Sequence, residues 1–243
     1  MSARIDRIII TGASSGIGLD AARRFLAEGS RVIINGRDAA KLEQARVALG
    51  HPDRVVAVAG AVGDPATGQR LAEAAKRHFG GVDVLVNNAG IFGAKPFLES
   101  TEAELDAFYT TNLKGTFLVT QAVLPLLISA GGGAIINVGT VLVEQPLKAA
   151  PCSAAMASKG GVHALTRSLA VEFADRNIRV NCVAPGIIRT PLLGAAADSF
   201  AGIHPLARIG EVDETSDAIL YLARATFVTG SVLDVDGGYA HGR

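Results

Sequence analysis

The 243-residue chain is predicted to form one α/β domain, a three-layer, doubly wound parallel sheet with helices on both faces. Short runs rich in Val and Ile alternate with helical patterns along the chain. These runs show little polar alternation, which is typical of parallel strands covered by helices on both sides. The length and a hydrophobic content of 49% suit a single core. Parallel strands joined by right-handed crossovers follow from this order of elements.

The predicted elements follow one another in a regular order. Apolar runs predict strands at residues 7–10, 31–34, 54–58, 82–86, 134–138, 178–183 and 231–236. Helical patterns predict helices at residues 17–28, 39–49, 69–79, 102–128, 153–175 and 214–223. Asp38 and Asp64 are expected to cap the helices that follow them, the second with Pro65 at its first position. No linker or internal repeat divides the chain, so residues 1–243 are predicted to form a single domain.

Composition argues against several classes of function. Lys plus Arg and Asp plus Glu each total 23, so the net charge is zero, and no basic run suggests nucleic acid or an anionic membrane. Cys152 and Cys182 are too few for a disulfide framework and favour a reducing compartment. We find no secretory signal pattern and no apolar stretch long enough to span a bilayer. We therefore expect a cytoplasmic protein without a metal site.

A glycine-rich turn lies between the first predicted strand and the first predicted helix. Residues 11–18 read Thr-Gly-Ala-Ser-Ser-Gly-Ile-Gly, with the spacing Gly-x-x-x-Gly-x-Gly. Glycines allow a sharp turn and a close approach to a pyrophosphate, which then binds at the helix N-terminus. A tight strand–helix loop without a ligand gives a similar pattern. The position of the turn favours a dinucleotide site.

Further segments occur in the order found in one family. They are Asn-Asn-Ala-Gly at 87–90, Asn112, Ala-Ser-Lys at 157–159, Pro-Gly-Ile-Ile-Arg-Thr at 185–190, Val-Thr-Gly at 228–230 and Val-Asp-Gly-Gly at 235–238. With the glycine turn, they make the chain resemble the short-chain dehydrogenase/reductase family from residue 7 to residue 239. The resemblance implies a Rossmann fold and an NAD(P)(H)-dependent oxidoreductase that acts on a carbonyl or alcohol.

The resemblance also implies where the cofactor binds. The residues concerned are Gly12, Ser14, Ser15, Gly16, Ile17, Gly18, Arg37, Val62, Asn88, Ala89, Gly90, Lys159, Pro185, Gly186, Ile188 and Thr190. Gly36 stands where an NAD-selecting acid is expected, and the adjacent Arg37 favours NADP(H) over NAD(H), although a solvated turn arginine is the alternative. Ala61 stands where the family has an aspartate that meets the adenine. Losing such a hydrogen bond costs about 1.5–3 kcal/mol, so weaker cofactor binding is expected.

The catalytic residues implied by the resemblance are incomplete. Asn112 and Lys159 are present, and Thr140 stands at the position of the catalytic serine. The family's proton-transferring tyrosine lies four residues before the lysine, on the same helix face. That position is Ala155, which can transfer no proton. Positioned acid–base catalysis typically contributes about 10²–10⁴-fold, so weakened or non-standard catalysis is expected.

Several groups are alternatives to the missing tyrosine. Water beside Lys159 is the simplest substitute, followed by Ser153 and by Tyr239 of a neighbouring subunit. His163 is expected on the helix surface or at a subunit interface. Packing roles are expected for the remaining candidates, which are Cys152, Tyr109 and Tyr221. The functional alternatives are a catalytically silent nucleotide-binding oligomer and non-redox chemistry such as proton abstraction by Lys159.

Two further expectations concern the substrate and the assembly. Residues 190–205 are mostly small and apolar, so we expect a mobile lid over an apolar, uncharged carbonyl or alcohol substrate. The predicted helices 102–128 and 153–175 carry more apolar surface than one sheet face uses. A homotetramer of two-fold symmetry is therefore expected, as is common in the family.

Overall fold

The computed structural model describes residues 6–242, except for the side chains of residues 195–197. The first five residues and the alanine side chains at 195–197 of the expected lid lie outside the described part. Residues 6–242 form a seven-stranded sheet in the order β3-β2-β1-β4-β5-β6-β7. Every neighbouring pair of strands is parallel. The predicted doubly wound α/β fold is confirmed.

The strands and helices occur in the predicted order. The strands are β1 (Arg7–Ile10), β2 (Arg31–Gly36), β3 (Val55–Ala59), β4 (Val84–Asn87), β5 (Gly133–Val138), β6 (Ile178–Pro185) and β7 (Val232–Val235). The α-helices are α1 (Gly16–Ala27), α2 (Ala39–Leu49), α3 (Pro65–Phe79), α4 (Glu102–Phe108), α5 (Gly115–Ser129), α6 (Ser153–Glu172) and α7 (Val212–Arg224). Shorter helical segments are η1 (Phe97–Glu99), η2 (Tyr109–Lys114), η3 (Val141–Val143), η4 (Ala174–Arg176) and η5 (Gly194–Ile203).

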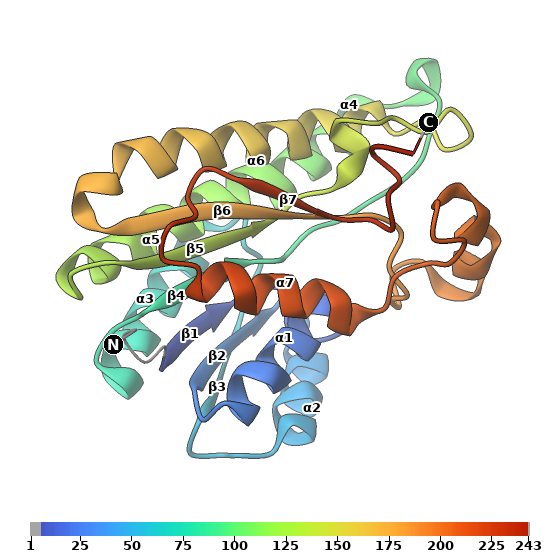
Figure 1. Cartoon of the computed structure of the whole chain (residues 1–243). Helices are drawn as coiled ribbons and strands as arrows, with labels where there is room; N and C mark the ends of the chain where they lie inside the picture. Colours follow the sequence, from blue (N-terminus) through green and yellow to red (C-terminus); the bar gives the residue numbers. More distant parts are fainter. Residues whose placement is uncertain (1–5, 243) are drawn as a thin grey trace.

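Helices cover the sheet on both faces (Figure 1). Ile8 and Ile10 of β1 belong to one buried cluster, with side chains of α1, α2 and α7. Ile9 between them belongs to a second cluster, with side chains of α3, α5 and α6. This alternation follows from the two-residue period of a strand. Burying a side chain of this size contributes about 1.5–3 kcal/mol, so each face of β1 stabilises its own helical layer.

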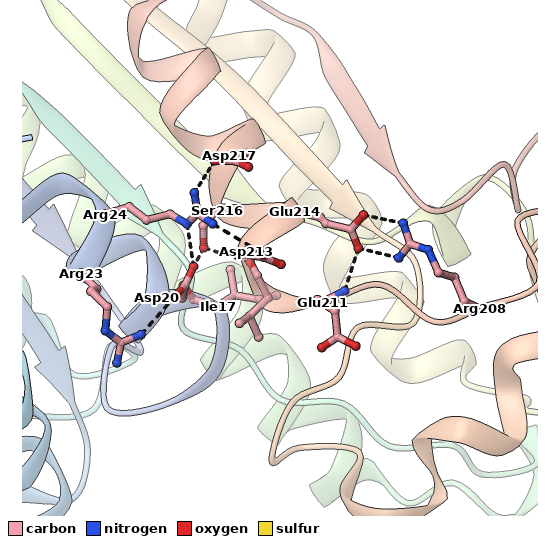
Figure 2. Close-up of polar contacts among 11 residues, drawn as sticks. Ile17, Asp20, Arg23, Arg24, Arg208, Glu211, Asp213, Glu214, Ser216 and Asp217 are labelled. Carbon is pink, nitrogen blue, oxygen red and sulfur yellow. Dashed lines mark hydrogen bonds and ion pairs between the residues drawn. The ribbon is translucent and has the colours of Figure 1, made fainter. Parts of the chain in front are cut away.

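The seam between α1 and α7 joins the two ends of the sequence. Figure 2 shows Arg24 of α1 next to Asp20 on its own helix and to Asp213 and Asp217 of α7. Ser216 of α7 donates to the carbonyl of Ile17. Pairs that are this exposed contribute about 0–1 kcal/mol each. The apolar contacts beneath them therefore hold the C-terminal helix against the first one.

Both predicted helix caps are confirmed. Asp38 accepts hydrogen bonds from the N–H groups of Ala40 and Lys41, and Asp64 accepts from Ala66 with Pro65 at the helix start. The helix after Asp64 begins at residue 65, not at the predicted residue 69. Gly68 lies inside this helix, at a close contact with α5. A Cβ on Gly68 would be 3.1 Å from the Leu118 carbonyl oxygen. This glycine therefore allows two helices to approach closely.

The predicted helix at 102–128 is not a single α-helix. It is α4, a π-helical segment η2 and α5 in succession. Asn112 lies inside η2, and its side chain bonds to Ile91 and Ser158 instead of facing solvent. Such π-turns often occur at functional sites. The prediction was wrong here because apolar periodicity does not distinguish a π-turn from an α-helix.

Candidate active site

The glycine turn and the end of β4 form one hydrogen-bonded unit. Thr11 Oγ1 accepts from the backbone N–H groups of Asn88 and Ala89 at 3.1 and 3.0 Å. In return, Asn88 Nδ2 donates to the carbonyls of Thr11 and Gly12 at 3.0 and 2.9 Å. The Asn88 amide therefore fixes the shape of the turn.

Close packing explains the glycines of this turn. Gly12 has a φ of +63°, and a Cβ on it would lie 2.7 Å from Ala89 Cα. A Cβ on Gly18 would lie 2.4 Å from Asn88 Nδ2 and 2.6 Å from the Gly12 carbonyl oxygen. Neither position tolerates a side chain without movement of backbone or of the Asn88 amide. Gly16, with a φ of +56°, faces Thr190, so the loop after β6 reaches the glycine turn.

The N-terminus of α1 fits an anionic ligand. Ser15 is the N-cap in an extended conformation, yet its side chain makes no capping hydrogen bond. The first turn of α1 contains no acidic residue. Backbone N–H donors and the positive end of the helix dipole are therefore available where a pyrophosphate would bind. At the end of β2, a Cβ on Gly36 would lie 3.3 Å from Ser14 Oγ, and exposed Arg37 follows.

Lys159, Asn112 and Gly90 meet at the carboxyl ends of β4 and β5. Lys159 Nζ donates to the Val138 carbonyl at 2.6 Å, and Asn112 Oδ1 accepts from the Ile91 N–H at 2.8 Å. A Cβ on Gly90 would lie 3.2 Å from both Lys159 Nζ and Asn112 Oδ1. Burial lowers the pKa of Lys159 to about 8. Lys159 forms no ion pair within residues 6–242.

Asn112 is a fully buried link between three segments. Its Nδ2 donates to the Ile91 carbonyl at 3.1 Å and to Ser158 Oγ at 2.9 Å. Ser158 Oγ in turn donates to the Ala155 carbonyl at 2.7 Å. The chain Asn112–Ser158–Ala155 connects η2 to the first turns of α6, so it fixes the backbone on which Lys159 lies.

Thr140 lies between the ends of β5 and β6. Its Oγ1 accepts from the Leu142 N–H at 3.3 Å and lies 3.5 Å from the Pro185 carbonyl. The first contact caps η3, and the second is at the limit of a hydrogen bond. The hydroxyl is therefore positioned at the same sheet edge as Lys159.

Ala155 faces an apolar cluster. Its side chain is 1% exposed, and the same buried cluster includes Val141, Leu142, Leu147, Cys152, Ala184 and Tyr239. The space around the methyl group is thus occupied by side chains of this chain. A larger residue at position 155 requires these neighbours to move. The assignment of Ala155 to the tyrosine position stays a prediction.

His163 lies elsewhere than expected. It is 2% exposed, not on the helix surface. Its imidazole occupies the space that Gly139 leaves, because a Cβ on Gly139 would lie 2.3 Å from His163 Nε2. His163 Nδ1 is 3.9 Å from Glu144 Oε1, and burial lowers the pKa of the ring. His163 therefore packs behind the loop that carries Thr140.

The other substitutes for the tyrosine divide into buried and exposed residues. Tyr239 is 2% exposed within its own chain, and Cys152 is buried, which raises the pKa of its thiol. Ser153 is exposed at the start of α6. The packing expected of Tyr109 and Tyr221 is wrong, because both are more than half exposed. Their helices turn the rings outward, away from the apolar layers.

The remaining predicted cofactor residues line the same sheet edge. The Val62 side chain is buried beneath Gly115, where a Cβ would lie 2.5 Å from Val62 Cγ2, so only its backbone can face a ligand. Pro185 ends β6, and Ile188 is buried and bridged to Gly210. Their contacts to a cofactor stay predictions.

Sequence reasoning missed three residues that shape the site. Thr11 and Ser158 act through the hydrogen bonds described above, and their place inside family motifs was the available signal. His204 Nε2 accepts from the Ile187 N–H at 3.2 Å, next to the predicted cofactor segment. Nothing in the sequence marks this histidine, because its partner is a backbone group seventeen residues earlier.

Comparison with known proteins agrees with this geometry. The family model described as enoyl-(acyl carrier protein) reductase matches residues 12–240. The chain is 38% identical to galactitol 2-dehydrogenase (L-tagatose-forming) of Cereibacter sphaeroides over 241 residues, covering 95% of this chain and 93% of that protein. It is also 38% identical to the 3-oxoacyl-[acyl-carrier-protein] reductase of Thermotoga maritima over 237 residues, covering 95% and 96%.

Solved structures are similar over the whole fold. A short-chain type dehydrogenase/reductase from Mycobacterium marinum has a TM-score of 0.93 at 32% identity, covering 98% of this chain and 96% of that chain. L-Sorbose reductase from Gluconobacter frateurii, solved with NADPH and L-sorbose, has a TM-score of 0.91 at 30% identity, and both chains are covered completely. The motifs, the sheet order and these similarities lead to one conclusion. The chain belongs to the short-chain dehydrogenase/reductase family of oxidoreductases.

Proposed function

We propose that this chain binds NADP(H) in preference to NAD(H) and interconverts a carbonyl and an alcohol on a small apolar substrate, at a rate lowered by Ala155. The observation that carries the proposal is the meeting of Lys159 and Asn112 at Gly90, beside the glycine turn. Relatives named for galactitol oxidation, 3-oxoacyl reduction and L-sorbose reduction support the reaction class.

The residues present fit a nicotinamide dinucleotide. The N-terminus of α1 would hold the pyrophosphate, Lys159 the nicotinamide ribose, and the segment from Pro185 to Thr190 the nicotinamide. When bound, the cofactor supplies or accepts a hydride. Arg37 is exposed and makes no hydrogen bond or ion pair with another described residue, so its guanidinium is free to pair with a 2′-phosphate. The NADPH bound in L-sorbose reductase is in keeping with this choice.

The protein's own groups leave proton transfer incomplete. The Thr140 hydroxyl can donate a hydrogen bond to a substrate oxygen. Lys159, with a pKa near 8, is mostly cationic at pH 7 and can stabilise negative charge nearby. No phenol extends from position 155. We therefore expect turnover well below that of a complete site.

A silent nucleotide-binding protein is the second candidate function. The burial of Ala155 among apolar side chains favours it, because the alanine methyl group can transfer no proton. A third candidate function is proton abstraction by Lys159, which the lowered pKa of this lysine supports. Turnover separates the first account from the other two, and nucleotide titration separates a silent binder from a chain that binds nothing.

We also propose that the chain forms a homotetramer in the cytoplasm. Several large apolar side chains on η1, α4, η2 and α5 are exposed: Phe97, Leu98, Leu105, Tyr109 and Phe117. We infer that these side chains contribute to an interface between subunits. Both cysteines are buried and unpaired, in keeping with a reducing compartment. Within residues 6–242, the helices lack the length and apolar character needed to cross a bilayer. Light scattering at micromolar concentration tests the tetramer, and a mass near 25.0 kDa contradicts it.

The decisive experiment titrates the protein with NADP⁺ and NAD⁺ by calorimetry and then assays a panel of ketones and secondary alcohols with both cofactors. We expect tighter binding of NADP⁺ and slow turnover of apolar substrates. Binding without turnover supports the silent binder. Failure to bind either nucleotide rejects both accounts.

A further inference from the structure

The segment after β6 is held in place by a small set of hydrogen bonds. Gly186 N–H donates to the Val235 carbonyl, Gly210 N–H donates to the Ile187 carbonyl, and Arg189 N–H donates to the Gly210 carbonyl. The fourth bond runs from the Ile187 N–H to His204 Nε2 at 3.2 Å. Of these four bonds, only the last depends on a side chain, and that side chain can take up a proton. Farther along the segment, the Arg189 side chain pairs with Asp198 and Glu211.

His204 is built into this position from several sides. It is 4% exposed and follows η5, the helical segment that lies beside the sheet edge in Figure 1. A Cβ on Gly186 would lie 3.0 Å from His204 Nε2, and one on Gly237 would lie 3.3 Å from His204 Cβ. The ring also lies 6.0 Å from that of Tyr239. Two glycines thus leave room for the imidazole between β6 and the C-terminal turn.

The chain beyond His204 is anchored to α7. Arg208 donates to both carboxylate oxygens of Glu214, as Figure 2 shows. Leu206 N–H donates to the Gly237 carbonyl. His204 is therefore attached to the body of the protein on its C-terminal side, which allows it to hold Ile187 firmly.

We propose that His204 is a positioning residue, whose neutral imidazole holds the Ile187 N–H and so fixes residues 186–188 in the form that the nicotinamide cofactor requires. This inference rests on the proposed function for the role of that segment. Nε2 can accept the Ile187 hydrogen only when it carries no proton, so the bound tautomer has its proton on Nδ1. Protonation of Nε2 turns the acceptor into a donor facing another donor.

The surroundings keep the ring neutral at pH 7. Burial lowers the pKa of His204 more strongly than the carbonyls of Ala201 and Phe200 and the Asp236 carboxylate raise it, and Arg208 lowers it further. Glu214, which lines the same small cavity, is already paired with Arg208. The acceptor is therefore present at pH 7 and is lost as the pH falls through the lowered pKa of His204.

Two nearly isosteric substitutions test this role. His204→Gln keeps an acceptor at the same number of bonds from Cα, whereas His204→Met has the same length and no comparable acceptor. At pH 7 we expect NADP⁺ affinity near wild type for the Gln variant and about three- to tenfold weaker for the Met variant. As the pH falls through the lowered pKa of His204, we expect the wild-type affinity to fall toward that of the Met variant. The Gln variant cannot titrate at this position, so its NADP⁺ affinity should fall less over the same pH change. That smaller fall reports the contribution of the other titratable groups, His163 included.

Hydrogen exchange of the nucleotide-free protein provides the second readout. The Ile187 amide should exchange faster in His204→Met than in His204→Gln, and faster in wild type at low pH after correction for the intrinsic rate. Equal exchange and equal affinity in the two variants overturn the proposal, as does an identical pH dependence in wild type and Gln variant. If the Met variant fails to fold, the comparison of wild type with the Gln variant across pH still decides. If nothing binds NADP⁺ yet exchange follows the expected order, the positioning role stands and the proposed function fails.

Discussion

The two halves of the sheet edge depend on different kinds of residue. At the β1–β4 half, the site depends on glycines, because a Cβ on Gly12 would collide with the Ala89 backbone and a Cβ on Gly18 with the Asn88 amide. At the β5–β6 half, the site depends on side chains, and position 155 contributes only its carbonyl to the hydrogen-bond network. The hydrogen bond at position 155 uses the backbone and does not depend on the side chain there, whereas a Cβ on Gly18 would displace the Asn88 amide that holds the turn. We therefore expect the glycine turn to keep its shape whichever side chain stands at position 155.

The largest expected effect comes from restoring a phenol at the β5–β6 half. Ala155→Tyr should raise carbonyl reduction about 10²-fold, the low end of what a positioned acid contributes. Lys159, one helical turn away, would lower the pKa of the new phenol by its charge. Steady-state assays with both cofactors on the ketone and alcohol panel measure the gain.

Ala155→Phe is the matched control, because it adds the same ring without the hydroxyl. Both variants should lose about 1–3 kcal/mol of stability, since the apolar cluster around Ala155 must move. An equal gain in the Phe variant, or a wild-type protein that already turns over at the rate of the Tyr variant, contradicts the catalytic assignment.

At the β1–β4 half, adding a single methyl group should lower the stability of the protein. Gly18→Ala places a Cβ 2.4 Å from Asn88 Nδ2, so the amide must give up at least one of its two hydrogen bonds. We expect the free energy of unfolding to fall by about 2 kcal/mol, measured by urea denaturation. Gly202→Ala is the control, because nothing lies within 4 Å of a Cβ there. Equal stability of the two variants would show that the turn is not rigid.

Cofactor choice tests whether the β2 loop belongs to the nucleotide site. Arg37→Asp should weaken NADP⁺ binding about tenfold and leave NAD⁺ binding little changed, because only NADP⁺ carries the 2′-phosphate. Arg37→Lys retains the charge and should fall between wild type and the Asp variant. Calorimetry with both nucleotides gives the comparison. Equal affinities that the substitutions do not change mean that Arg37 is a solvated turn residue.

The smallest effect is expected from the adenine end. Ala61→Asp should tighten NADP⁺ and NAD⁺ alike by about three- to tenfold, since the adenine is common to both. Ala61 is exposed, so the new carboxylate replaces water and gains less than a buried one. Ala61→Asn separates charge from hydrogen bonding. A change for one nucleotide alone contradicts an adenine contact.

Local patterns were sufficient where one segment determines its own structure. The caps at Asp38 and Asp64 were predictable because the acceptor and its donors are two or three residues apart. The π-turn at Asn112 was not, because it depends on Ile91 and Ser158 from distant segments. The burial of His163 depends likewise on Gly139 from another element.

The sequence by itself determined the order of strands and helices, the glycine turn and the presence of Lys159 with alanine four residues before it. Apolar periodicity and motif spacing are local properties, so they can be recognised in the sequence alone. Only the tertiary structure decided that Ala155 faces an apolar cluster and that Ile187 is held by His204. Both depend on contacts between segments remote in the chain, and such contacts form only when the layers pack.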